Sequence, residues 1–441
     1  MLAGIMPVIL HSMRVPNQQV GDAPEEGPVD PKSLIAEEDV KGTLLIDKGE
    51  DAELISWEIV DFTKTGDNYS TFVTSIQVTY SLNGEELQVS YVVKVNPCRD
   101  LEGFQSITHA LFEKEANFYK SIVPDLNSVL EEAGIEKLNV PICYHANLDA
   151  EREQVYYEDL RARGFQMVDR KQGLDIAHTN LVLKELAKLH AASRLLQEKF
   201  PEEPLVEKYD PTLRDWFNQG EDANAVLIPI LQAHFIQAGD ILQSVGMDRR
   251  ALDWIENLLP ILQDVITSNM QSETFGSICH GDCWSNNLLF RYEGDEPVEM
   301  MLVDFQACQY ATVASELNHL LYATVTSDVR SENLESFLDI YYSTYNGILE
   351  AGGVEPNFTE EELMDEFRNK NILGAIFVIT CIPNELLDED EVLEMTEDEA
   401  ETELVVNDFW TRMKNSAVRS PMLGPRFLSI FDEFLATGLI P

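Results

Sequence analysis

Alternating apolar and polar positions dominate the first third of the chain. Runs rich in β-branched and aromatic residues, separated by Gly, Asn and Asp, predict an antiparallel meander of strands. These strand-like runs cover residues 54–62, 72–80, 87–95, 138–146 and 154–160. A helical period at 112–123 separates the third run from the fourth. The expected order is therefore three strands, a helix and two further strands.

Helical periodicity takes over after Leu160. Apolar residues recur at three- and four-residue intervals in long segments at 181–196, 253–266, 335–349 and 371–382. Two stretches interrupt this pattern, at 277–290 and 299–306, where short apolar runs meet polar residues. They resemble strands that flank functional loops. The chain should be an α+β protein, with a small strand-rich lobe followed by a larger helical lobe.

Residues 1–40 are expected to be a flexible leader, because 21–40 is rich in Pro and acid and poor in large apolar residues. The apolar start of the chain is not preceded by basic residues, so we expect no signal peptide. An acidic run at 387–404 is expected to be a solvated surface.

The size and net charge of the chain exclude some classes of binding partner. With 441 residues, 44% of them hydrophobic, the chain can bury one large core or two lobes. A formal charge of −47 would repel nucleic acid and anionic membranes, so neither is expected as a partner. A nucleotide is still allowed, because a local lysine and bound magnesium can overcome a distant field. Six dispersed cysteines and the lack of a membrane-length apolar run favour a cytoplasmic, monomeric protein with reduced thiols.

Phosphoryl transfer requires a carboxylate that orients the attacking hydroxyl, oxygen ligands for magnesium, and a cation that places the nucleotide. His280-Gly281-Asp282 is followed five positions later by Asn287, which suits a base and a metal ligand. Asp304 ends the apolar run before Phe305, where a second metal ligand belongs. Each of these residues alone is more often a cap or turn former. Their combination at this spacing favours a catalytic role over the role of separate caps and turns.

Lys94 lies inside the strand-like run at 87–95, where a buried charge is costly unless it is paired or faces a ligand. It matches the phosphate-contacting lysine of kinases, with Glu113 or Glu115 in the following helix as its ion-pair partner. The alternative is a lysine that protects an exposed sheet edge, with the glutamates facing solvent.

A turn at 66–71 stands where a loop would cover the nucleotide, and Gly66, Asn68 and Ser70 are its candidate binding residues. With one glycine it could equally be a plain hairpin. Cys279 and Cys283 flank His280, but without a second ligand cluster we expect buried thiols and not zinc. His190, on an apolar helical stripe, is expected to be a core histidine.

At this point the sequence resembles the ecdysteroid kinase-like family, also called CHK-kinase-like, which is related to choline and aminoglycoside kinases. The resemblance runs from about Leu54 to near the C-terminus. It is most specific in three blocks, which are GDNYST with YVVKVNP, EDLRARGFQMVDRKQGLD with LAKLHAAS, and CHGDCWSNNLLF with VDFQ.

The resemblance implies a two-lobed, protein-kinase-like fold with a small N-lobe sheet, one main helix and a larger helical C-lobe. The lobes would be 41–160, with the nucleotide-binding sheet and hinge, and 161–441, with the catalytic and acceptor sites. It implies ATP and Mg²⁺ as cofactors and the hydroxyl of a small molecule as acceptor, either an ecdysteroid or a xenobiotic or secondary metabolite.

Carried over by position, the resemblance makes Asp282 the catalytic base, Asn287 and Asp304 the magnesium ligands, and Glu115 the partner of Lys94. Its hinge would contact adenine through the backbone at Glu158, Asp159 and Leu160. One departure is Glu316, which stands where such proteins usually carry an Asp that supports the catalytic loop. The rival readings are a choline- or aminoglycoside-type kinase and a catalytically inactive kinase-fold binding protein.

Overall fold

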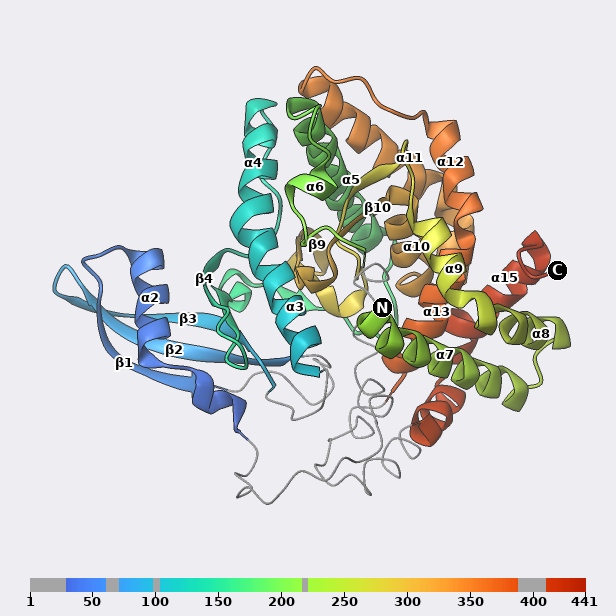
Figure 1. Cartoon of the computed structure of the whole chain (residues 1–441), viewed down its shortest axis with the longest axis horizontal. Coiled ribbons are helices and arrows are strands. Elements are labelled where there is room, and N and C mark those ends of the chain that lie inside the picture. The colour runs from blue at the N-terminus through green and yellow to red at the C-terminus, as the bar shows by residue number, and fades with distance from the viewer. Residues whose placement is uncertain (1–28, 61–70, 98–103, 216–220, 388–409) are drawn as a thin grey trace.

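The computed structural model describes residues 29–60, 71–97, 104–215, 221–387 and 410–441. One antiparallel sheet forms the N-terminal lobe (Figure 1). Its strands are β1 (Glu53–Val60), β2 (Phe72–Leu82), β3 (Glu85–Val95), β4 (Cys143–Asn147) and β5 (Gln154–Glu158). The spatial order β1-β2-β3-β5-β4 places β3, which carries Lys94, at the centre. The predicted Asn83-Gly84 turn joins β2 to β3, and both residues have positive φ, as a tight hairpin requires.

The expected flexible leader is wrong for its last part. Residues 29–40 include a short 3-10 helix and the start of helix α2 (Glu37–Lys48). Three apolar side chains of this stretch are buried in the core of the sheet, namely Leu34, Ile35 and Val40. Their spacing lets them pack together although their neighbours are polar, which composition alone could not show. Residues 1–28 lie outside the described part of the chain.

A single long helix follows the third strand. It consists of α3 (Phe104–Asn117), a π-helical turn at Phe118–Ile122 and α4 (Val123–Glu132). The Val123 N–H donates to the Phe118 carbonyl, five residues back, directly before Pro124. Because proline has no N–H, the regular ladder of hydrogen bonds cannot continue there, and the turn widens. The predicted helix at 112–123 lies within this element.

Helices dominate the C-terminal lobe (Figure 1). They are α5 (Ile176–Lys199), α6 (Leu205–Lys208), α7 (Glu221–Ser244), α8 (Arg249–Leu258), α9 (Leu262–Met270), α10 (Val313–Ala323), α11 (Ser327–Ala351), α12 (Glu360–Asn369), α13 (Asn371–Glu385) and α15 (Ser429–Thr437). All four predicted helical segments fall on helices, although the one at 253–266 is split by a 3-10 turn that contains Pro260. The core is built where α5 packs on α11 and α10 packs on α13.

Two small sheets carry the loops between the lobes. β7 (Gly276–Cys279) pairs with β10 (Gln309–Thr312), and β8 (Leu288–Glu293) lies between β6 (Gln166–Met167) and β9 (Glu296–Leu302). The strands expected around the functional loops are therefore present. A strand-rich lobe with one long helix, joined to a larger helical lobe, is the two-lobed α+β fold of the protein-kinase type.

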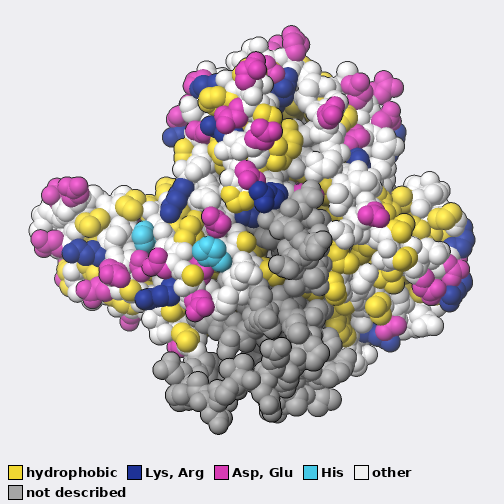
Figure 2. Space-filling view, in the orientation of Figure 1, with side chains coloured by type: hydrophobic (Ala, Val, Ile, Leu, Met, Phe, Trp, Pro, Cys, Tyr) yellow, Lys and Arg dark blue, Asp and Glu magenta, His cyan; other side chains and the backbone are white. Residues whose placement is uncertain are grey.

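Acidic side chains are spread over the visible face of both lobes and do not gather in one patch (Figure 2). The described cysteines Cys143, Cys279, Cys283, Cys308 and Cys381 are free. In the part of the chain that the structure describes, no helix is long and apolar enough to span a membrane.

A fully buried ion pair ties the C-terminal segment to the lobe. The Arg426 guanidinium contacts the Glu385 carboxylate, and neither side chain is exposed to solvent. Arg426 also donates to the carbonyls of Arg170, Lys171 and Ala323. Burial raises the pKa of Glu385 to about 6 despite the adjacent cation. One arginine thus holds three chain segments together.

We expect Arg426→Leu to lower the free energy of unfolding by about 3–5 kcal/mol, because it leaves the Glu385 carboxylate buried without its cation. The double variant Arg426→Leu/Glu385→Leu should recover a large part of this loss, since no unpaired charge is left. Urea denaturation measures both. Equal stability of the single variant and the native protein would show that Glu385 is compensated in another way.

Candidate active site

Lys94 connects the N-terminal sheet to the rest of the site through two ion pairs. Its Nζ lies 2.6 Å from Glu115 Oε2 on α3 and 2.8 Å from Asp304 Oδ1 after β9. Gln306 Oε1 is 3.3 Å away. Lys94 is central in the sheet, opposite Val73 on β2 and Val155 on β5, so it is not an edge-strand lysine. The structure thus brings together Lys94, Glu115 and Asp304, which lie far apart in the sequence.

The charges in this cluster do not balance. Burial acts to lower the pKa of Lys94, but the two carboxylates outweigh it and the net shift is upward, so the ammonium stays charged. Burial, with the second carboxylate of Asp304, raises the pKa of Glu115 against the pull of Lys94. One cation facing two carboxylates leaves an excess negative charge. A site of this kind favours a further cation.

Asp304 is held in an unusual conformation. Its backbone has φ 67° and ψ 67°, in the left-handed region that non-glycine residues rarely adopt. The 3-10 turn Phe305–Ala307 begins immediately after it. Local strain of this kind is typical of functional positions, where the surrounding structure fixes a side chain in place.

The residues of the predicted catalytic loop lie between β7 and β8. Asp282 is fully buried, and the Asn287 side-chain amide donates to its backbone carbonyl at 2.9 Å. The same nitrogen is 3.5 Å from Asp282 Oδ2. The Asn287 nitrogen is used in these contacts, which leaves its Oδ1 as the atom that a metal ion would take. Gly281 has φ 81°, and a Cβ there would lie 2.1 Å from the Ala307 carbonyl oxygen, so only glycine fits.

His280 links this loop to the strand that ends at Asp304. Its Nε2 lies 2.9 Å from the Val303 carbonyl, which can only accept a hydrogen bond, so Nε2 carries the proton. Its Nδ1 then accepts the Asp282 N–H at 3.2 Å. The Phe305 ring packs against His280 on one side and stacks on Phe118 of the long helix at 3.9 Å. The loop, β9 and the long helix are therefore fixed to one another.

Glu316, in the first turn of α10, binds the backbone of this loop. Its two carboxylate oxygens accept the backbone N–H groups of His280 and Gly281. The longer side chain therefore does reach the loop amides. Burial acts to raise the pKa of Glu316, but its contacts with His190 and His280 give a net lowering. Glu316 is thus a buried carboxylate held in its charged form.

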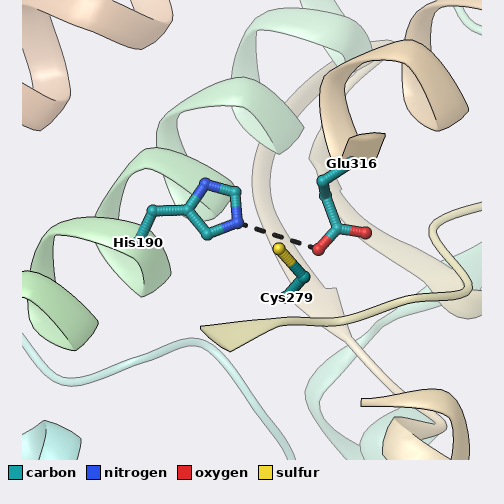
Figure 3. A group of neighbouring side chains, drawn as sticks. All are labelled: His190, Cys279 and Glu316. Atoms are coloured by element: carbon teal, nitrogen blue, oxygen red, sulfur yellow. Dashed lines mark ion pairs between the residues drawn. The ribbon is translucent and has the colours of Figure 1, made fainter. Parts of the chain in front are cut away.

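Figure 3 shows His190 of α5 pointing at Glu316, with Cys279 beside both. His190 Nε2 is 3.8 Å from Glu316 Oε2, and its Nδ1 is 2.7 Å from the Tyr341 hydroxyl. Because Nδ1 can accept the Tyr341 proton, Nε2 can carry a proton toward the carboxylate. The sequence predicted a core histidine, and His190 is fully buried. Its position beside Glu316 could be found only from the fold.

The side chains of His190, Cys279 and Glu316 are close enough to be considered as a metal site. The ligand atoms of His190, Cys279 and Glu316 lie within 4.8 Å of one another. Burial raises the pKa of the Cys279 thiol well above its usual range, which disfavours the thiolate that a metal would need. The group offers three ligands where structural zinc takes four. Neither Cys283 nor His280 belongs to it, and we assign no metal there.

The hinge residues lie where β5 leaves the N-terminal lobe. The Glu158 N–H donates to the Ile142 carbonyl at 2.9 Å, and the Leu160 carbonyl accepts the Phe165 N–H at 3.1 Å. The side chain of Asp159 accepts the Ser90 hydroxyl at 2.6 Å. The backbone groups of Glu158 and Leu160 that are bonded in this way are not available to an adenine ring. Any such contact must use other groups of this segment.

Gly66, Asn68 and Ser70, the candidate residues of the nucleotide-covering loop, lie outside the described residues, as does almost all of the acidic run at 387–404. Sequence reasoning did not single out Gln306, although it is part of the VDFQ block. The structure places its side chain against both Lys94 and Asp304.

We expect Glu316→Gln to lower turnover by about 10- to 100-fold, because the amide would direct an NH₂ at one of the two loop N–H groups and lose a charge-assisted bond. Glu316→Asp, which restores the usual residue, should keep or improve activity. Steady-state kinetics with melting temperatures measure both, and Glu335→Gln on an exposed helix position is the control. A clear loss in Glu316→Asp would mean that Glu316 has another role.

No curated protein sequence matches the chain significantly. Among solved structures, a Plasmodium vivax ethanolamine kinase is similar at 11% identity and a TM-score of 0.37, covering 92% of this chain and 97% of that one. A GDP complex of aminoglycoside 2'-phosphotransferase-IIIa is similar at 12% identity and a TM-score of 0.33, covering 84% and 97%.

A sequence model of the ecdysteroid kinase-like family matches residues 65–352, which is well over half of the chain. The matched range includes β3, the long helix, the catalytic loop and Glu316. The chain therefore belongs to the ecdysteroid kinase-like family.

Proposed function

We propose that this protein transfers the γ-phosphoryl group of ATP to a hydroxyl of a small molecule. That it is a phosphotransferase for small molecules follows from its family. The observation that supports ATP and magnesium is the convergence of Lys94 and Asp304 at 2.8 Å, beside the loop that holds Asp282 and Asn287. A lysine for phosphate oxygens, hard oxygen ligands and a buried carboxylate are the parts that phosphoryl transfer needs.

The residues present fit a magnesium ion. Asp304 offers a carboxylate oxygen and Asn287 an amide oxygen, which are the donors that Mg²⁺ prefers. The excess negative charge around Lys94 is what such an ion would offset. When bound, magnesium would neutralise charge on the phosphate oxygens and hold them in line for attack.

Each residue then has a separate task. Lys94, oriented by Glu115, binds phosphate oxygens of the nucleotide. Asp282 accepts a hydrogen bond from the acceptor hydroxyl and turns its oxygen toward the γ-phosphorus. It takes up the hydroxyl proton as the new P–O bond forms, while the bond from the γ-phosphorus to the β–γ bridging oxygen breaks and ADP leaves. Asn287 fixes Asp282 through its backbone carbonyl. Asp304, whose Oδ1 lies against Lys94, would hold magnesium beside the phosphates that Lys94 binds.

The acceptor is proposed to be an ecdysteroid or a xenobiotic or secondary metabolite, on the strength of the family alone. A choline- or aminoglycoside-type acceptor is the alternative. ATP consumption measured against steroid, phenolic, amino-alcohol and aminoglycoside panels separates them. Turnover with cationic acceptors alone would overturn the first choice.

We expect Asp282→Asn to lower turnover by about 10²- to 10⁴-fold, because the amide cannot accept the hydroxyl proton. Affinity for Mg-ATP should change little, since Asp282 does not hold the nucleotide. Transfer of ³²P to an accepted substrate and calorimetric titration with Mg-ATP measure the two effects. Asp339→Asn, on an exposed position of α11, is the matched control. Retained transfer in Asp282→Asn would reject this role.

Magnesium binding can be measured without turnover. The melting temperature of the native protein should rise with ATP and rise further when Mg²⁺ is added, because a ligand present at about 100 times its Kd adds roughly 2.7 kcal/mol of stability. Asp304→Asn should lose the magnesium-dependent part. An inactive kinase-fold binding protein would show no magnesium-dependent step, and that result in the native protein would favour this alternative.

A further inference from the structure

Helix α3 carries a second buried charge next to Glu115, and the proposed chemistry does not use it. The side chain of Lys114 is buried, and its Nζ donates to the Arg214 carbonyl at 2.8 Å. Successive residues of a helix point about 100° apart. Glu115 therefore reaches Lys94 in the N-terminal sheet, while Lys114 reaches a different part of the protein.

That part is the segment 205–215, which we call the strap. It begins with α6, which lies near α4 in Figure 1. The Tyr209 hydroxyl donates to Asp125 Oδ2 on α4 at 2.6 Å. At its other end, the Leu213 carbonyl accepts the Tyr310 N–H of β10 at 2.9 Å. The strap thus joins the long helix to the strand that follows the Asp304 turn.

The pKa of Lys114 reflects both its burial and its charged neighbours. Burial lowers its pKa to about 8, while Cys308 and Asp215 act to raise it and the Arg214 cation adds to the lowering. Burial raises the pKa of Cys308 to about 12, so its thiol is neutral near pH 8. The Asp215 carboxylate, itself buried, is then the negative charge that favours protonated Lys114.

Because Glu115 lies on α3, a rotation of this helix about its axis would move the Glu115 carboxylate away from Lys94. The hydrogen bond from Lys114 Nζ to the Arg214 backbone carbonyl constrains this rotation from the side that faces the C-terminal lobe. We propose that Lys114 is a positioning residue, which ties α3 to the strap and so holds Glu115 against Lys94 in the geometry that binds the phosphates of ATP. The proposal rests on the proposed function, since it needs Lys94 to bind a nucleotide.

The test is the Kd for Mg-ATP, measured by calorimetry on the full chain. Lys114→Met keeps the length of the side chain and removes the charge and the donor, and should weaken Mg-ATP binding about tenfold. Lys120→Met removes the same charge six residues further along the same long helix, at an exposed position, and should leave the Kd unchanged. Equal affinities in Lys114→Met and the native protein would overturn the proposal.

A purely structural role for Lys114 is separated by a double variant. In a Glu115→Gln background the pair with Lys94 is already weakened, so adding Lys114→Met should change the Kd for Mg-ATP less than about twofold. An undiminished tenfold effect in that background would mean that Lys114 does not act through Glu115. Absence of Mg-ATP binding in the native protein would reject the proposed function itself, which is a different result.

A pH dependence gives an independent readout. Mg-ATP affinity should decline above about pH 8 in the native protein, by less than the loss that Lys114→Met causes, because the neutral amine still donates to the Arg214 carbonyl but loses the charge that strengthens this bond. Because the pKa of Lys114 is lower in the folded than in the unfolded chain, the unfolded chain binds more protons between about pH 8 and 10.5. Lys114 therefore makes the folded state more stable, not less, as pH rises through this window. The decline should be missing in Lys114→Met, and its persistence there would count against the proposal.

Discussion

The ammonium group of Lys94 between two carboxylates is the interaction on which the rest of this structure depends. Glu115 and Asp304 approach it from the long helix and from the end of β9, so one side chain joins the sheet, the helix and the C-terminal lobe. A buried lysine is stable only with compensating charge, and two carboxylates exceed what one ammonium needs. The same arrangement that makes the cluster stable in the fold therefore leaves an excess negative charge, on which the proposed magnesium site rests.

The catalytic loop depends on a second buried charge. Glu316 binds two backbone N–H groups of the loop, and His190 lies against the same carboxylate with Tyr341 behind it. Gly281 allows the loop to pass close to the Ala307 carbonyl, where any side chain would collide. The position of Asp282 is thus set by residues on α5 and α10 that take no part in the chemistry. A longer Glu in place of Asp is tolerated because the loop amides remain within its reach.

Much of the architecture could be predicted from periodicity. The strands around Lys94 and the helices at 181–196 and 371–382 follow directly from the spacing of apolar residues, because burial on one face imposes that spacing. The start of the N-terminal lobe could not be predicted in this way. Leu34, Ile35 and Val40 are three apolar residues in a polar stretch, and only the sheet that they cover gives them a place to be buried. The π-helical turn before Pro124 likewise depends on local hydrogen bonding that a pattern of polarity does not record.

The sequence by itself determined which chemistry was available: Lys94, Asp282, Asn287 and Asp304 are of the right types, and the spacing from Asp282 to Asn287 is local enough to be read directly. Only the tertiary structure decided how they combine. In the folded chain Glu115 and not Glu113 pairs with Lys94, because a helix directs only one of these two side chains to the sheet. It also placed His190 beside Glu316 and Lys114 against the strap, since contacts between residues distant in sequence exist only once the chain has folded.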